Sequence, residues 1–267
     1  MSNFLYGANI HANGIRQHYL RYGGKGQPLL IVPGITSPAI TWGFIAERFS
    51  KHFDTYVLDV RGRGLSSTGP DLAYDIDSCA DDIIEFTKEL GLKDYILVGH
   101  SMGARFGIKA LARGDKNMGK LVLVDPPVSG PNRREYPSKL PWYVDSIRAA
   151  TKGCDLNVMR EYCATWSDEQ LSLRAEWLHT CYEPAIVDAF NGFHEDDIHQ
   201  DISSISIPTL LMVAENGGVI LPEDEDEIQG LLPSIKINAI KDAGHMIPWD
   251  NFDGFFEGFK DFLGTKL

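Results

Sequence analysis

The chain has 267 residues, with 25 lysines and arginines against 37 aspartates and glutamates, so its formal net charge is −12. This length suits one large α/β domain. The acidic balance argues against nucleic acid as a partner and against an anionic membrane surface, since both select basic faces.

The amino-terminal segment MSNFLYGANIHANG has neither a basic start nor an apolar core, so we expect no signal peptide. No apolar run approaches the roughly 18 residues that suggest a membrane span. None of the four cysteines forms a CxxC pair, and we expect reduced, buried thiols. These are Cys79, Cys154, Cys163 and Cys181. The cytoplasm is therefore the expected compartment.

Short apolar segments alternate with helical patterns along the chain. Strands are expected at 18–22, 28–34, 55–60, 95–99, 120–125, 208–214 and 235–240, and helices at about 77–90, after Ser101 and near 250–264. Buried strands separated by helices predict an α/β fold, in which a parallel sheet carries helices on both faces.

Residues 126 to 200 interrupt this alternation, because they contain amphipathic helical patterns and no clear strand. A helical insertion between two parallel strands would lie above their carboxyl ends, where such folds place ligands. We expect residues 1–125 and 201–267 to form the core and residues 126–200 to form a helical cap. A helical elaboration remote from the active site is the alternative.

The segment GHSMG places Ser101 where a predicted strand becomes a predicted helix. This is the context of a nucleophile elbow, a tight turn in which Gly99 and Gly103 avoid clashes that a Cβ would create. The helix amino-terminus directs free N–H groups towards developing negative charge, so the Met102 N–H is one expected oxyanion donor. Ser101 is the candidate nucleophile.

A serine nucleophile needs a base, and His245 follows the last predicted strand, at the same sheet edge as Ser101. His100 adjoins the serine, but its side chain is expected to point away and to be structural. His194 and His199 have an i, i+5 spacing that suits a helical metal site poorly, and we expect a solvated face there instead.

The base also needs an orienting carboxylate. The loop after the strand at 208–214 is the usual place for it, but Gly217 and Gly218 stand there, with Glu215 just before them. Asp125 ends the strand at 120–125, the next along the chain after the nucleophile strand. We favour Asp125 and keep Glu215 as the alternative. Asp224 and Asp226 are expected at the start of a solvated acidic helix.

A second oxyanion donor is expected in the loop after the strand at 28–34, where the Ile35 N–H would face Met102. Trp42 follows in the same loop. It is a candidate for the wall of the substrate pocket, and a place in the core is equally compatible with its position.

Four segments, taken in order, resemble the α/β-hydrolase fold family. PGITSPAITW resembles its oxyanion loop, with Pro-Gly in place of the usual His-Gly, and DVRGRGLS resembles its D-x-R-G-x-G-x-S loop. GHSMG resembles the elbow and AGH the histidine segment. The resemblance covers essentially the whole chain and implies an eight-stranded, mostly parallel sheet flanked by helices, with the cap inserted after the sixth strand.

The acid at Asp125 is placed as in a minority of this family, and together with the overall sequence it resembles amide hydrolases of ring-fission products in nicotinate and vitamin B6 degradation. That resemblance implies cleavage of a small anionic amide through an acyl-enzyme, without metal or organic cofactor. A cation in the cap would then bind the substrate carboxylate. The candidates are Arg133, Arg134, Arg148, Arg160 and Arg174, of which Arg174 is selected.

Two other functions remain open. The same triad would serve an esterase or lactonase that acts on a small neutral substrate. A ligand receptor with the hydrolase fold is the non-catalytic alternative, and the intact Ser-Asp-His order argues against it.

Overall fold

The computed structural model describes residues 2–267, which contain one eight-stranded sheet with the order β1-β2-β4-β3-β5-β6-β7-β8. The strands are β1 (Phe4–Ala12), β2 (Ile15–Tyr22), β3 (Pro28–Val32), β4 (Asp54–Leu58), β5 (Tyr95–His100), β6 (Met118–Val124), β7 (Thr209–Ala214) and β8 (Lys236–Ile240). β1–β2 and β2–β4 pair antiparallel, and the other neighbours pair parallel. The expected mostly parallel sheet is confirmed.

Strand β1 was not predicted from its own residues. It is a largely exposed edge strand without the buried apolar run that marks the central strands. Asn13 and Gly14 join it to β2, with φ angles of 50° and 72°. Asn-Gly favours the two-residue hairpin turn that needs positive φ at both positions, so this dipeptide was the available signal.

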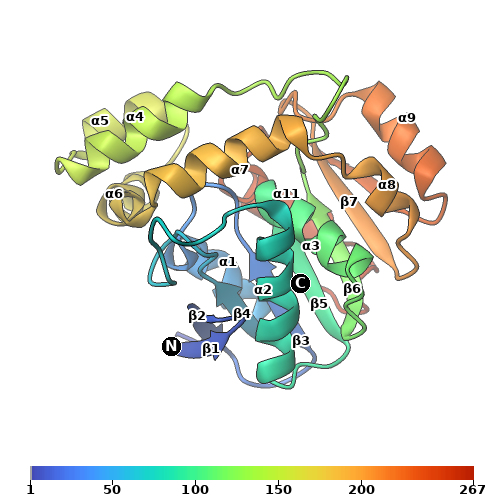
Figure 1. The fold of residues 1–267 in the computed structure, drawn as a ribbon. Coiled ribbons are helices and arrows are strands. Elements are labelled where there is room, and N and C mark those ends of the chain that lie inside the picture. Colours follow the sequence, from blue (N-terminus) through green and yellow to red (C-terminus); the bar gives the residue numbers. More distant parts are fainter. Residues whose placement is uncertain (1) are drawn as a thin grey trace.

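Helices cover both faces of the sheet. α2 (Ile76–Glu89) and α3 (Met102–Ala112) lie on one face, and α1 (Gly43–Phe49) and α11 (Phe252–Glu257) lie on the other (Figure 1). Between them, strands such as β5 are buried along their whole length. This two-sided burial explains why the central strands read as continuous apolar runs.

The chain between β6 and β7 contains helices and no strand within the described residues. Its helices are α4 (Leu140–Thr151), α5 (Leu156–Tyr162), α6 (Asp168–Trp177), the short 3₁₀ helix η2 (Leu178–Thr180), α7 (Glu183–Glu195) and α8 (His199–Ser203). Helices α4 to α7 lie above the carboxyl ends of the strands (Figure 1). The last of the set, α8, packs against α3 and against α9 (Pro222–Leu231) of the sheet-flanking layer.

The helix expected at 250–264 is shorter and divided. α10 (Ile247–Asp250) is followed by Asn251, whose φ of −141° and ψ of 83° are not helical. The Asn251 side chain then accepts a hydrogen bond from the Gly254 N–H at 2.8 Å and so caps α11. Residues 258–263 form turns. A capping asparagine inside an apolar periodic pattern therefore divides the predicted helix in two.

The remaining ordered element is the 3₁₀ helix η1 (Ala39–Trp42), which leads into α1.

Three of the cysteine thiols are buried, that of Cys154 is half-buried, and all four are free. Over the described chain, no helix has the length and apolar character needed to cross a bilayer.

Candidate active site

Ser101 lies in a sharp turn between β5 and α3. Its φ of 51° and ψ of −116° are strained for a residue with a side chain. A Cβ on Gly99 would approach Ala104 Cα to 2.6 Å, and one on Gly103 would overlap the Val32 carbonyl oxygen. Only glycine fits at these two positions, so the GHSMG segment is required for the turn that projects the serine.

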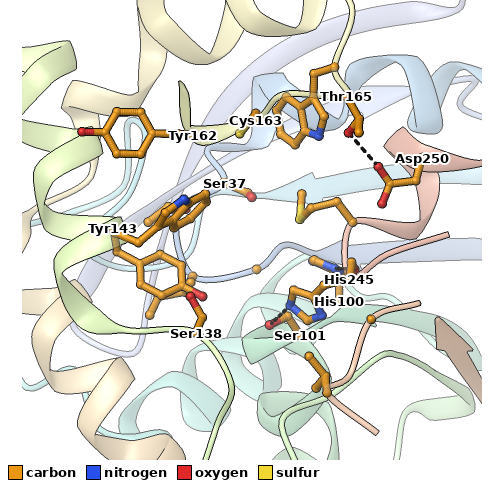
Figure 2. Close-up of a pocket in the computed structure, with 18 of the residues that line it drawn as sticks. Ser37, His100, Ser101, Ser138, Tyr143, Tyr162, Cys163, Thr165, His245 and Asp250 are labelled. Atoms are coloured by element: carbon orange, nitrogen blue, oxygen red, sulfur yellow. Dashed lines mark hydrogen bonds between the residues drawn. The ribbon is translucent and has the colours of Figure 1, made fainter. Parts of the chain in front are cut away.

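Ser101, His245 and Asp125 form one chain of hydrogen bonds. His245 Nε2 lies 3.0 Å from Ser101 Oγ (Figure 2). His245 Nδ1 lies 2.7 Å from Asp125 Oδ2. The aspartate is completely buried, whereas the histidine side chain is 22% exposed. A carboxylate that accepts from Nδ1–H leaves Nε2 free to accept the serine proton, which is the arrangement needed for nucleophilic catalysis.

The register of the sheet explains how residues so distant in sequence meet. His100 pairs with Val124 across β5 and β6, so Ser101 and Asp125 leave adjacent strands at the same level. The Ser101 N–H donates to the Val124 carbonyl at 2.8 Å, which fixes this level. His245 lies in the loop after β8 and enters from the same edge.

The carboxylate of Asp125 is held through both of its oxygens, since Oδ1 accepts from the Ala214 N–H at 3.2 Å and Oδ2 contacts His245. A Cβ on Gly217 would lie 3.1 Å from Oδ2. A side chain at the usual acid position would therefore crowd Asp125. Glu215 is exposed, and it accepts from the Asp242 N–H at 3.1 Å.

Two backbone N–H groups are available near Ser101. Met102 is the first residue of α3, so its N–H has no acceptor within the helix. Within residues 2–267, the Ile35 N–H meets no hydrogen-bond acceptor. Arg63 holds both residues in place, because its Nε donates to the Ile35 carbonyl at 3.0 Å and its Nη2 lies 3.4 Å from Met102 Sδ.

The sequence interpretation expected the His100 side chain to point away from the site, but the structure shows it lining the cavity above Ser101. Its Nε2–H donates to the His245 carbonyl at 3.0 Å, and the two rings lie 5.0 Å apart. Burial, followed by the neighbouring His245, lowers the pKa of His100 to about 3. His100 is therefore neutral at ordinary pH and helps to hold the backbone of His245.

Trp42 belongs to the core and not to the pocket wall. It is fully buried, and its ring packs edge-on against Trp249 at 4.9 Å and beside His100 at 5.4 Å. Of the two places that its position in the sequence allowed, the structure shows the core, and Trp42 is not among the residues that line the cavity. Thr36 and Ser37 line the cavity instead.

A cavity of about 400 Å³ opens above Ser101 (Figure 2). Its walls come from the oxyanion loop and from the chain around α4, α5 and α6. The Tyr136 hydroxyl lies 3.3 Å from His245 Nε2, a contact that sequence reasoning missed. The Asp250 carboxylate also faces the cavity, where it accepts from the Thr165 hydroxyl and the Gly244 N–H.

Arg174 lines this cavity and differs from the other candidate cations. Its side chain is buried, at 3% exposure, and forms no ion pair within residues 2–267. Its Nη1 and Nη2 donate to the carbonyl and hydroxyl of Thr36, both at 3.3 Å, while Nε has no partner among the residues that the structure describes. Its guanidinium lies over the rings of Trp142 and Trp166. Such a group is available to an anionic ligand.

The other candidate arginines are each paired with a carboxylate. The pairs are Arg133 with Glu227, Arg134 with Asp224, Arg148 with Glu183 and Arg160 with Asp168. Pairing with Arg134 also means that Asp224 is not a free solvated group.

The histidines near 194–199 need one correction. His199 is buried and hydrogen-bonded to Asp197 at 2.9 Å, so the solvated face expected there does not include it. No cluster of metal-ligating side chains occurs in the described part of the chain.

Comparison with known proteins shows which family the chain belongs to. Residues 27–252 match the family described as the alpha/beta hydrolase fold. The chain is 67% identical over 267 residues to N-formylmaleamate deformylase of Pseudomonas putida strain KT2440, with 100% of both chains covered. The crystal structure of N-formylmaleamic acid deformylase from Pseudomonas putida S16 superposes with a TM-score of 0.92 at 51% identity, covering 96% of this chain and 100% of that one.

A more distant structure, that of E-2-(acetamidomethylene)succinate hydrolase, has a TM-score of 0.79 at 21% identity and covers 98% of this chain and 100% of its own. This likeness shows a shared fold and nothing more.

Proposed function

Because the chain belongs to the α/β-hydrolase fold family, we propose that it hydrolyses the C–N bond of N-formylmaleamate and releases formate and maleamate. The family resemblance and the resemblance to amide hydrolases of ring-fission products, both drawn from the sequence, are confirmed. The observation that carries the proposal is a cavity that joins the Ser101 hydroxyl to a buried arginine with no carboxylate partner within residues 2–267, in a chain so similar to that deformylase along its full length.

In the first half of the reaction, Ser101 Oγ attacks the formyl carbon while His245 Nε2 takes the hydroxyl proton. The Ile35 and Met102 N–H groups hold the oxygen that becomes negative, and each such donor contributes about 3 kcal/mol of transition-state stabilisation. The buried Asp125 carboxylate stabilises the imidazolium that forms. His245 lies within hydrogen-bond distance of both Ser101 and Asp125, as these steps need.

In the second half, His245 returns the proton to the nitrogen as the C–N bond breaks, and maleamate leaves. Ser101 then carries a formyl ester. A water molecule deprotonated by His245 attacks this ester, and formate is released as the serine regains its proton. No metal or organic cofactor takes part in these steps.

Arg174 binds the carboxylate of the substrate in this proposal. An arginine presents several N–H donors in one plane, which suits carboxylate recognition. Its contacts with Thr36 link the carboxylate subsite to the oxyanion loop. A substrate anchored there would place its formyl end towards Ser101.

We also propose that residues 126–200 act as the cap over a core formed by residues 1–125 and 201–267. Helices α4 and α6 supply cavity walls from this segment. The free thiols fit a reducing compartment, so we infer the cytoplasm.

The test is formate release from N-formylmaleamate, with phenyl formate as a neutral ester for comparison. We expect kcat/KM for N-formylmaleamate to exceed that for the ester, and Ser101→Ala to abolish both activities. Brisk hydrolysis of phenyl formate and other short aryl esters without formate release from N-formylmaleamate would identify a carboxylesterase instead.

A further inference from the structure

Tyr136 is a cavity residue that the triad mechanism does not use. It lies in the irregular segment between β6 and α4, and its side chain is buried, at 2% exposure. Its hydroxyl lies 3.3 Å from His245 Nε2 and 3.2 Å from the Tyr143 hydroxyl. Tyr143 lies in α4 and faces the same cavity (Figure 2). The phenol is thus placed beside the atom that returns the proton to the leaving group.

The position of this phenol can be compared with the leaving group of the proposed substrate. The scissile nitrogen of N-formylmaleamate carries a second carbonyl, and within one amide the nitrogen and oxygen lie about 2.2 Å apart. His245 Nε2 must approach the nitrogen to protonate it. A hydroxyl 3.3 Å from Nε2 is then within reach of the oxygen of that second carbonyl, so that two donors face two neighbouring acceptors.

We propose that Tyr136 donates a hydrogen bond to the second carbonyl oxygen of the leaving group and stabilises the charge that develops there as the C–N bond breaks. The inference rests on the proposed function. The electron pair of the C–N bond passes to nitrogen and delocalises onto that oxygen. His245 Nε2–H supplies the proton that nitrogen retains, and Tyr136 keeps its own. Leaving groups without a second carbonyl have no acceptor at this place.

The phenol is suited to donate. Burial is the main cause that raises the pKa of Tyr136 well above its usual value, so the group stays protonated. In the absence of substrate, its proton competes with that of Ser101 for the single lone pair on His245 Nε2. The other neighbour of its hydroxyl is another phenol, Tyr143, which can donate to Tyr136 and strengthen it as a donor.

The experiment compares Tyr136→Phe with the matched control Tyr143→Phe, whose hydroxyl contacts Tyr136 and not His245. The substrates are N-formylmaleamate, diformamide and phenyl formate. Diformamide keeps the second carbonyl and lacks the carboxylate, whereas phenyl formate lacks both. The rate of covalent labelling of Ser101 by a fluorophosphonate reports the serine and histidine alone, since fluoride leaves without help from a carbonyl.

We expect Tyr136→Phe to lower kcat/KM about 100-fold for the two imides, N-formylmaleamate and diformamide. The labelling rate and kcat/KM for phenyl formate should change less than about threefold. Tyr143→Phe should lower imide hydrolysis by less than about fivefold, because the donor remains.

If Tyr136→Phe lowers kcat/KM for the imides, kcat/KM for phenyl formate and the labelling rate by equal factors, Tyr136 only positions His245 and the proposal is overturned. Unchanged kcat/KM for the imides would also overturn it. Failure of the wild-type protein on N-formylmaleamate alone would refute the proposed function, and the diformamide comparison would still decide the role of Tyr136. A protein that hydrolyses neither imide would refute both.

Discussion

Replacing Asp125 by asparagine tests the triad most directly. Asp125 Oδ1 accepts from the Ala214 N–H, so the asparagine oxygen should keep that place. Its amide nitrogen would then face His245 Nδ1, now 2.7 Å from Oδ2, and would donate to it. The histidine proton must move to Nε2, which can no longer accept from Ser101. The substitution therefore traps the unproductive tautomer while the packing is retained.

We expect kcat/KM for formate release from N-formylmaleamate to fall about 10⁴-fold in Asp125→Asn, as for the equivalent change in serine proteases. This loss corresponds to about 5.5 kcal/mol of transition-state stabilisation. KM should change little, since Asp125 does not line the cavity. The control is Glu215→Gln, whose exposed carboxylate contacts the Asp242 N–H and should be replaceable within about twofold. An Asp125→Asn protein within tenfold of wild type, or a larger loss in Glu215→Gln, would refute the assignment.

Three further outcomes can be checked with the same protein. Arg174→Met should lower kcat/KM for N-formylmaleamate about 100-fold through the loss of charged hydrogen bonds, and that for phenyl formate only a few-fold; equal losses would contradict carboxylate binding. Gly103→Ala should destabilise by at least about 3 kcal/mol in urea, whereas Gly230→Ala in α9, with open space around the new methyl, should not. Because the folded pKa of His100 is about 3 against 6.5 unfolded, the unfolded state binds the extra proton and stability falls below pH 6.5. The fall in the free energy of unfolding from pH 7.5 to pH 5, measured in urea, should be about 2 kcal/mol smaller in His100→Asn than in the wild-type protein. The same fall in both proteins would contradict the buried neutral state.

The elbow and its partners were predictable because each depends on local pattern and on one property of parallel sheets. GHSMG follows an apolar run and precedes a helical pattern, so the position of Ser101 is determined by neighbours in sequence. Asp125 and His245 each follow a buried strand, and parallel strands end at one edge. Choosing Asp125 over Glu215 needed a further fact, the absence of an acid at Gly217.

Other residues were beyond prediction because distant packing determines their environment. Trp42 is a core residue in a place where Trp249, near the other end of the chain, and His100 pack against it. Tyr136 lies in a segment without helical or strand periodicity, so no pattern indicates where its hydroxyl points. Strand β1 differs, since the Asn13-Gly14 dipeptide that follows it is a usable hairpin signal.

The choice among the cap arginines depends on what surrounds each one. The chain has 37 acidic against 25 basic side chains, so an arginine at its surface readily meets a carboxylate. Arg133, Arg134 and Arg148 do so with residues 94, 90 and 35 positions away, which composition alone cannot foresee. In such an acidic protein, an arginine stays unpaired only where no carboxylate lies within reach of its guanidinium, and within residues 2–267 none reaches Arg174. Arg174 is enclosed by two tryptophan rings and Thr36, and in the proposed function its charge binds the carboxylate of the substrate.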